Sequence, residues 1–272
     1  MAATLRVAGW NIRAAIGPGP FPDRWWSRID ADRLRAIGSF IAGLDADVVA
    51  LQEVALLSRD GDLVDNPGDL ARQLGMELRY AAVRTFGVTD GARVTGSGCF
   101  GNAILSRLPI DATRTVALPR AAANTWVEPP GSDHPAAGRR YAEAPAHIRE
   151  PRCLLLAEVA GIMVGSTHFS NVGSGERLLQ AEATVAEFAG GTRALLLGDL
   201  NASIEAPELA PFSTWADGFV EPPGDPARTS TDDGMRIDHV LARGARVHGC
   251  RVARESGDLS DHYPVVATVS QG

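Results

Sequence analysis

Val48-Val-Ala-Leu-Gln-Glu53 is an unbroken apolar run that ends in an amide and a carboxylate. Runs of this kind are typical of strands that are buried on both faces. A second such run, Ala194-Leu-Leu-Leu-Gly-Asp199-Leu-Asn201, ends in the same way. A carboxylate directly after an apolar strand is desolvated unless a cation or hydrogen bonds compensate its charge. Glu53 and Asp199 are therefore either turn residues or ligands.

The residues on either side of the first run predict a strand, a helix and a strand. Residues 5–10 form a short apolar strand, and residues 29–44 carry apolar side chains at helical spacing before the strand at 48–53. Several later strands are adjacent in sequence, which favours hairpins and two sheets packed face to face with helices outside. We find no repeat and no linker, so we expect one α/β domain over residues 1–272. Further strands are predicted at residues 77–83, 103–106, 113–118, 153–159, 162–167, 194–197, 237–241, 247–253 and 265–269, and further helices at 68–74 and 175–188.

The composition excludes several classes of protein. The 272 residues are 45% hydrophobic and 22% charged, as in a folded soluble protein, and no apolar stretch is long enough for a membrane span. The net charge of −7 gives no overall attraction to nucleic acid or anionic lipid, so any phosphate recognition must be local. All 26 basic residues are Arg. The absence of Lys excludes a Walker phosphate loop, a Schiff-base enzyme and a Lys general base.

Cysteine spacing and the first residues bear on the compartment. Cys99, Cys153 and Cys250 are far apart, so neither a disulfide framework nor a structural zinc site is indicated. The chain starts with Met1 and enters an expected strand without the basic and apolar segments of a signal peptide. We therefore expect a cytoplasmic protein.

Two catalytic motifs are also excluded. Gly96-Ser-Gly98-Cys-Phe-Gly101 matches the dinucleotide-binding fingerprint as a string, but a predicted strand follows it where the fingerprint requires a helix. The Gly-x-Ser-x-Gly elbow of serine hydrolases does not occur.

Polar residues recur at the ends of other predicted strands. Three of the six histidines take such positions, and two of them directly follow an Asp. Oxygen ligands without cysteine suit Mg²⁺ or Mn²⁺ better than zinc, and His beside carboxylates can supply acid–base chemistry. The residues of this set are Asn11, His168, Asp238, His239, Asp261 and His262.

Taken in order, these positions resemble the motifs of the endonuclease/exonuclease/phosphatase superfamily, which includes deoxyribonuclease I. The resemblance runs from residue 10 to about 266. Each motif is weak alone, but the ordered set is specific. The motifs are Trp10-Asn11, Leu51-Gln-Glu53, Gly101-Asn-Ala-Ile-Leu-Ser-Arg107, Thr167-His168, Gly198-Asp199-Leu-Asn201, Ile237-Asp238-His and Ser260-Asp261-His262-Tyr-Pro-Val.

The resemblance implies a four-layer α/β/β/α sandwich of two mainly antiparallel sheets, and metal-dependent hydrolysis of a phosphoester. It implies that Glu53 is the principal metal ligand, with Asn11 and Asp261 completing or bordering the metal site. It further implies that Asp199 orients or deprotonates the attacking water, and that Asn201 holds the nucleophile or the phosphate. The remaining matches are His262 at the scissile phosphate, Asp238 orienting it, and His168 and Arg152 contacting phosphate oxygens as in the deoxyribonuclease I branch.

Several alternatives stay open. The motifs do not distinguish a phosphodiester from a phosphomonoester, or Asp199 from His262 as general base. The charge favours a small or short phosphoester over extended duplex DNA, with a DNA or RNA nuclease as the alternative and a non-catalytic phosphate-binding module as another. We expect a monomer without a protein partner. The proline-rich stretch 119–151, with Trp126, Arg139, Arg140 and Tyr141, is either a lid over the substrate or an ordered wall.

Some polar residues receive less weight. His239 stands where the family often has an aromatic residue, so a packing role is expected. Asn102 could support the site from behind, and Arg107 is expected to be a solvated charge at a strand end. His134 and His248 lack any motif and are expected at the surface.

Overall fold

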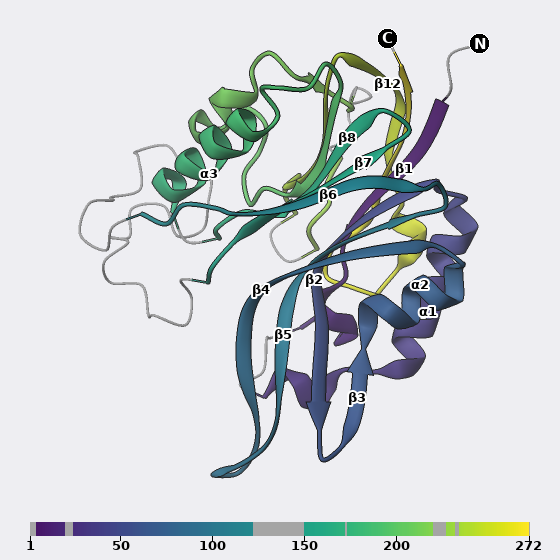
Figure 1. Ribbon diagram of the computed structural model, residues 1–272, viewed down its shortest axis with the longest axis vertical. Coiled ribbons are helices and arrows are strands. Elements are labelled where there is room, and N and C mark those ends of the chain that lie inside the picture. Colours follow the sequence, from purple (N-terminus) through teal and green to yellow (C-terminus); the bar gives the residue numbers. More distant parts are fainter. Residues whose placement is uncertain are drawn as a thin grey trace.

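The computed structural model describes residues 4–19, 24–121, 150–171, 173–219, 227–231 and 234–271, which form two sheets packed face to face (Figure 1). The neighbours β1–β2 and β8–β9 are parallel, and the other pairs are antiparallel. In spatial order, sheet A contains β12 (Ala245–Val252), β13 (Val265–Gln271), β1 (Thr4–Asn11), β2 (Val48–Arg59), β5 (Arg93–Ser106) and β4 (Glu77–Asp90), with β3 (Asp62–Asp65) paired to β2. Sheet B contains β10 (Ala216–Asp217), β11 (Asp238–Arg243), β9 (Ala194–Asp199), β8 (Ile162–His168), β7 (Cys153–Val159) and β6 (Ile110–Ala117).

Helices cover the outer face of each sheet. α1 (Ala31–Leu44) and α2 (Asn66–Leu74) pack on sheet A, whereas α3 (Ser174–Glu187) and the short helix η4 (Pro207–Phe212) pack on sheet B. Figure 1 shows α1 and α2 on one side of the molecule and α3 on the other. The predicted four-layer α/β/β/α sandwich is therefore confirmed. None of the described helices is long and apolar enough to cross a membrane.

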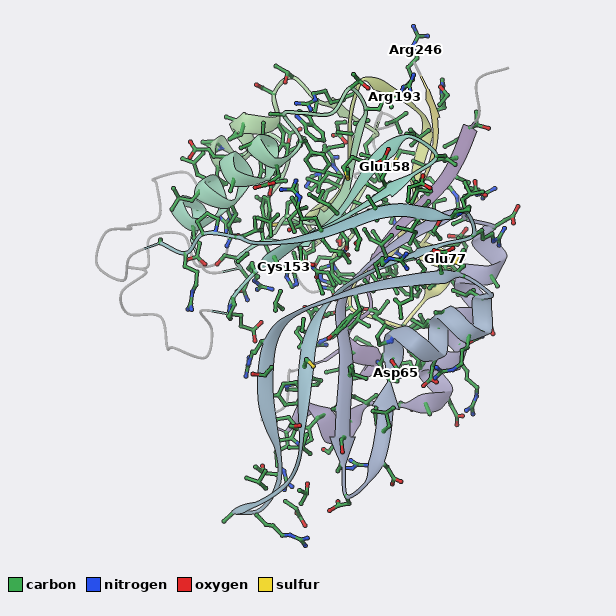
Figure 2. All side chains as sticks on the ribbon, in the orientation of Figure 1. Asp65, Glu77, Cys153, Glu158, Arg193 and Arg246 are labelled. Carbon is green, nitrogen blue, oxygen red and sulfur yellow. The ribbon has the colours of Figure 1, made fainter. Side chains whose placement is uncertain are left out.

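The apolar runs are continuous because both faces of the central strands are covered. In β2, Val48 and Ala50 belong to the core between the sheets, while Val49 and Leu51 pack beneath the helices. β9 follows the same rule, because its alternate leucines face the two opposite cores. Side chains fill the space between the sheets (Figure 2).

α1 begins and ends at aspartates. The carboxylate of Asp30 accepts hydrogen bonds from the backbone N–H groups of Asp32 (2.8 Å) and Arg33 (3.1 Å), as an N-cap does. The helix ends at Asp45, whose φ of 52° is left-handed. The predicted helix at 29–44 is therefore correct to within two residues at its start.

One prediction about β2 is wrong. Glu53 does not close this strand, which continues to Arg59. Leu51 pairs with Ala103 and Val54 with Gly101, so a bulge sets two residues of β2 against one of β5. Glu53 has a φ of 54°, and this bulge re-aims its side chain. A strand end and a bulge both interrupt the apolar pattern, so sequence periodicity does not separate them.

β4 and β5 form a long hairpin that sequence analysis predicted only at its base. Gly96, Gly98 and Gly101 all lie within β5, which excludes the dinucleotide-binding geometry. A Cβ at Gly98 would come within 2.6 Å of the ring of Phe86 on β4, and Cβ atoms at Gly96 and Gly101 would collide with the backbone of the neighbouring strands. These glycines therefore permit close strand packing.

The remaining expectations concern the cysteines and the proline-rich stretch. The three cysteines are free, with Cys153 buried and Cys99 and Cys250 half-buried. Most of residues 119–151, including Trp126, Arg139, Arg140 and Tyr141, lie outside the described residues, as does His134.

Candidate active site

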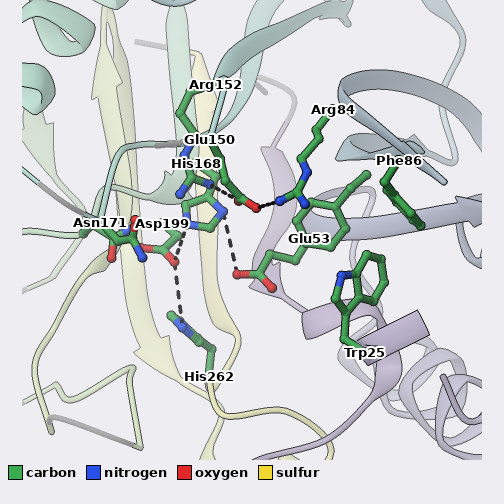
Figure 3. Close-up of a pocket in the computed structure, with 12 residues that line it drawn as sticks. Trp25, Glu53, Arg84, Phe86, Glu150, Arg152, His168, Asn171, Asp199 and His262 are labelled. Atoms are coloured by element: carbon green, nitrogen blue, oxygen red, sulfur yellow. Dashed lines mark hydrogen bonds and ion pairs between the residues drawn. The ribbon is translucent and has the colours of Figure 1, made fainter. Parts of the chain in front are cut away.

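The structure brings the predicted residues together at one end of the two sheets. Figure 3 shows Glu53, Arg152, His168, Asp199 and His262 of this set around the pocket. Asn11 ends β1, Glu53 occupies the bulge of β2, and His168 and Asp199 end the parallel strands β8 and β9. The parallel neighbours β8 and β9 end at the same edge of sheet B and so deliver His168 and Asp199 to one place. β1 ends at Asn11, which pairs with Gln52 and so lies beside the bulge that carries Glu53 in the continuing β2. The remaining residues come from the start of β11 (Asp238) and from the segment before β13 (Asp261 and His262).

Asp199 lies at the centre of the site. Its Oδ2 is 3.1 Å from Asn11 Nδ2, 3.3 Å from His168 Nε2 and 3.8 Å from His262 Nε2. Burial raises the pKa of Asp199 to about 7, against the opposing effect of the His262 charge. A buried carboxylate surrounded by three nitrogen groups can hold or receive a proton.

His262 and Asp238 form a buried dyad. His262 Nδ1 is 2.8 Å from Asp238 Oδ2, so Nε2 faces Asp199. Burial opposes the charged imidazole, but the carboxylates of Asp238 and Asp199 outweigh this and hold the pKa of His262 well above its usual range. The Oγ1 of Thr229 accepts hydrogen bonds from the backbone N–H of Ile237 and of Asp238, both at 3.0 Å, and so fixes the start of β11.

Glu53 and Asn11 lie side by side. Asn11 Nδ2 donates to Glu53 Oε1 (3.0 Å) as well as to Asp199, and so bridges carboxylates of both sheets. Burial, reinforced by the charge of Asp261, raises the pKa of Glu53. A cation beside Glu53 would relieve this unfavourable environment.

Asp261 is engaged differently from the other carboxylates. Its Oδ2 lies 3.1 Å from Nε of the buried Arg13, and its Oδ1 accepts from Ser260 Oγ at 3.2 Å. Arg13, Ala14 and Ala15 have φ values of 46°, 48° and 61°, so three successive residues form a left-handed turn that begins two residues after Asn11. Sequence analysis did not single out Arg13, although it follows the Trp10-Asn11 motif.

Arg152 and Glu150 also line the pocket. The side chain of Arg152 is only 5% exposed, and its Nε has no hydrogen-bond partner among the described residues. Glu150 is ion-paired with Arg84 of β4 and lies 4.0 Å from Arg152 Nη1. Burial and the Arg152 charge hold the pKa of His168 well below its usual range, so this histidine is neutral. An unpartnered buried guanidinium nitrogen suits an anionic ligand.

Asn201 also lines the pocket, at a left-handed position with φ of 51°. Its backbone N–H donates to Asp199 Oδ1 (3.0 Å), and its Nδ2 donates to the carbonyl of Phe169 (3.0 Å). These bonds fix the turn after β9 and the orientation of both side chains.

The donor set fits a hard divalent cation. Glu53 and Asp199 supply carboxylate oxygens, and burial raises the pKa of both. Asn11 turns Nδ2 toward these carboxylates while its Oδ1 accepts from the backbone N–H of Arg13, and Asp261 is held by Arg13. Asp238 Oδ1 is buried without a partner among the described residues. Among the described residues, Asp199, Asp238 and His262 are the group of acidic and histidine side chains that offers one ligand atom each within 4.8 Å of one another, so they form a possible metal site.

The pocket has a volume of about 350 Å³ and contains residues that sequence analysis missed. Arg84, Glu150 and Asn171 extend its polar side, and Trp25, Phe86 and Phe100 form an aromatic side. Strand alternation places Arg84 and Phe86 on one face of β4, and Phe100 is the register partner of Arg84. Strand alternation could have identified these residues only if the full length of the β4–β5 hairpin had been predicted.

Of the polar residues given less weight, His239, Arg107 and His248 lie outside the pocket, whereas Asn102 borders a small neighbouring cavity that Glu53, Arg152 and His168 also line. His239 is buried, with Nε2 2.8 Å from the carbonyl of Ala202. Asn102 is buried and donates to the carbonyl of Cys153 (3.1 Å), directly after Arg152. Arg107 is ion-paired with Asp45 at the surface, and the exposed His248 lies 2.8 Å from Ser270 Oγ.

The fold recurs in known proteins. The profile of the Endonuclease/Exonuclease/phosphatase family matches residues 8–262. A family protein from Beutenbergia cavernae DSM 12333 superimposes with a TM-score of 0.70, at 23% identity over 99% of this chain and 72% of that one. A family protein from Bacteroides vulgatus superimposes with a TM-score of 0.66, at 17% identity over 99% of this chain and 100% of that one. A mannosyl-6-phosphatase from Bacteroides thetaiotaomicron VPI-5482 superimposes with a TM-score of 0.62, at 18% identity over 97% of this chain and 99% of that one. No curated protein sequence matches the chain.

Proposed function

The chain belongs to the endonuclease/exonuclease/phosphatase family of phosphoester hydrolases, and on that premise we propose that it cleaves a small phosphoester with the help of Mg²⁺ or Mn²⁺. One observation carries the proposal. Asp199, Arg152 and His262, whose Nδ1 is held by Asp238, border a single pocket, and the buried Nε of Arg152 has no partner among the described residues. Such a site can hold a phosphoryl group and move a proton beside it.

Arg152, His168 and Asn201 bind the phosphoryl oxygens. Charge on these oxygens grows during in-line attack by water, so donors held in place by the fold stabilise the transition state more than the ground state. Arg152 is buried and already carries its charge next to the neutral His168. By analogy with an oxyanion-hole donor, each such group contributes on the order of 2.7 to 4 kcal/mol.

Asp199 and His262 divide the proton chemistry. Asp199 orients the attacking water and accepts its proton, because its Oδ2 faces the pocket between Asn11 and the two histidines. His262, with Nδ1 held by Asp238, keeps a proton on Nε2 and donates a hydrogen bond to the reacting phosphoryl group. This assigns Asp199, rather than His262, as the base.

Glu53 would hold the divalent cation, with Asn11 and Asp261 beside it. When bound, the cation supplies positive charge that neutralises the phosphoryl oxygens. Arg13 fixes the carboxylate of Asp261 by an ion pair, and the bulge of β2 orients the side chain of Glu53.

A small substrate agrees with the pocket and with the charge of the chain. A volume of about 350 Å³ is near the lower end for small-molecule sites. The net charge of −7 disfavours extended duplex DNA. One protein of similar structure is named a mannosyl-6-phosphatase, and that name supports the proposal of a small phosphate ester as the substrate. A nuclease remains the alternative that experiment must separate.

The test measures hydrolysis of a generic phosphodiester and a generic phosphomonoester with Mg²⁺, with Mn²⁺ and with EDTA. We expect turnover that requires the metal and is lost in Asp199→Asn. Stoichiometric phosphate binding without turnover of any ester would instead favour a non-catalytic phosphate-binding module.

A further inference from the structure

One wall of the pocket is aromatic. Trp25 lies on the short helix η2 (Trp25–Arg28), Phe86 on β4 and Phe100 on β5, and all three line the cavity. Their ring centroids are 5.0 Å (Trp25–Phe86) and 5.3 Å (Trp25–Phe100) apart in edge-to-face contact. We refer to Trp25, Phe86 and Phe100 as the aromatic wall.

The fold holds this wall in place. Trp26 stacks on Phe86 at 5.7 Å and 22°, and Trp25 and Phe100 are buried. Gly98 leaves room for the Phe86 ring, since a Cβ there would come within 2.6 Å of it. The helix η2 and the β4–β5 hairpin, which are distant in sequence, therefore present a preorganised apolar surface rather than flexible side chains.

The aromatic wall adjoins the phosphate-binding side. Figure 3 shows Glu53 between His168 on one side and Trp25 on the other, with Phe86 beyond Arg84. A ligand whose phosphoryl group lies at Asp199 and Arg152 would extend its next group past Glu53 toward these rings. Arg84, the charged residue nearest to them in the hairpin, is paired with Glu150.

We propose that the aromatic wall receives a flat aromatic group attached to the phosphoester, so that the preferred substrates carry a ring next to the phosphate. This inference rests on the proposed phosphoester hydrolysis and adds its substrate class. The chemistry is burial of a ring against apolar carbon, with offset or edge-to-face contacts between rings. A nucleobase and a simple aryl ring share this chemistry.

The first experiment isolates the ring from the reactivity of the leaving group. Benzyl phosphate and methyl phosphate release alcohols of similar acidity, and benzyl methyl phosphate and dimethyl phosphate form the corresponding diester pair. We expect kcat/KM to be at least about tenfold higher for the benzyl member of the cleaved pair. A nucleoside 5′-phosphate tests whether a nucleobase is recognised as well as the plain ring of the benzyl esters, and mannose 6-phosphate tests whether a sugar is recognised instead. Preference for the sugar phosphate would overturn the proposal.

The second experiment measures binding without turnover. Benzylphosphonate and methylphosphonate are not hydrolysed, so calorimetry with Mg²⁺ tests the wall even if no ester is cleaved. We expect benzylphosphonate to bind about tenfold more tightly. Equal affinities, or no binding of benzylphosphonate, would overturn the inference, whereas failure of the proposed function would appear only as absent turnover.

Matched variants locate the effect. Phe86→Leu keeps an apolar side chain and removes the ring, so the benzyl preference should fall by about three- to tenfold. Phe40→Leu is the control, because Phe40 is also half-buried and contacts Trp10 edge-to-face (5.7 Å) beneath α1, away from the pocket. If both variants lower the preference equally, or neither does, the assignment to the aromatic wall is wrong.

Discussion

Asn11 links the two halves of the candidate site, because its Nδ2 contacts a carboxylate from each sheet. Glu53 belongs to sheet A and Asp199 to sheet B. Both carboxylates have raised pKa values because they are buried, so each is sensitive to any cation brought near it. The residue-scale predictions follow from this arrangement.

Glu53→Gln should weaken Mg²⁺ or Mn²⁺ binding by more than about tenfold while preserving the fold. The amide keeps the size of the side chain but removes the charge that would hold the cation. Isothermal calorimetry measures the affinity. Glu150→Gln is the control, since that carboxylate lies in the same pocket but pairs with Arg84 and should matter little for the metal. Unchanged affinity in Glu53→Gln would refute the assignment.

Asp238→Asn should lower kcat by about three orders of magnitude with little change in KM. The amide no longer fixes the tautomer of His262 or stabilises its charge, although the imidazole is still present. Steady-state kinetics measures the change. Asp217→Asn is the matched control, because Asp217 pairs with Arg236 (2.7 Å) on the edge strand β10, outside the pocket. Near-normal kcat in Asp238→Asn would disprove the dyad.

The buried thiol of Cys153 leads us to expect that the free energy of unfolding falls as the pH rises above 9. Burial raises the pKa of its thiol to about 12, against 9.0 for an ordinary thiol. Below pH 9 the thiol is neutral in both states, but between pH 9 and 12 it ionises only in the unfolded chain. The folded state then loses up to about 1.4 kcal/mol per pH unit. Urea unfolding at pH 8 and 10 should show a smaller loss in Cys153→Ser than in the native chain, and identical losses would contradict this.

At the element scale, the cap of α1 can be tested directly. Asp30→Ala removes two hydrogen bonds to backbone N–H groups and should cost about 1 kcal/mol. The midpoint of thermal unfolding should fall by about 2 to 4 °C, as followed by circular dichroism. Asp32→Ala, in the first turn, removes an exposed carboxylate paired with Arg35 and should have a smaller effect. Equal shifts in both variants would contradict the capping role.

The elements that sequence predicted best are those with two covered faces or a clear helical face. The helix at 29–44 and the strands at 153–159 and 194–197 carry long apolar patterns, and the structure has α1, β7 and β9 there. The outer half of the β4–β5 hairpin has exposed or half-buried side chains and several glycines, so its pattern was too weak. This is why the aromatic wall was missed, although Trp25-Trp26 is an apolar pair between the strand predicted at 5–10 and the helix predicted at 29–44.

For the site, sequence predicted which polar residues meet but not how they are engaged. Asn11, His168 and Asp199 follow apolar strands, so strand topology alone brings them together. The bulge at Glu53 and the Arg13–Asp261 pair depend on local φ values and on contacts between distant segments. Neither leaves a periodic signal in the sequence.

At the scale of the whole molecule, charge predicts the response to nucleic acid. A protein that tracks a duplex neutralises several phosphates, and the logarithm of its affinity falls with the logarithm of salt concentration by about 0.9 per contact. With a net charge of −7, this chain should cleave small phosphate esters efficiently and nick plasmid DNA poorly. Both activities should be compared at two salt concentrations. Efficient nicking that weakens steeply with salt would favour the nuclease alternative.

The pairing of β1 with β13 joins the first and last strands of the described chain, from Thr4 beside Ser270 to Gly9 beside Val265. His262 lies three residues before the start of β13, and Trp10 Nε1 donates to its backbone carbonyl (2.8 Å). During translation, a nascent chain would carry Asn11, Glu53 and Asp199 long before this partner left the ribosome. Contacts between residues so far apart in sequence form late and slow folding. Connectivity thus delays assembly of the site until β13 has been synthesised, so that chains truncated before His262 would carry the carboxylates of the pocket without its proton donor.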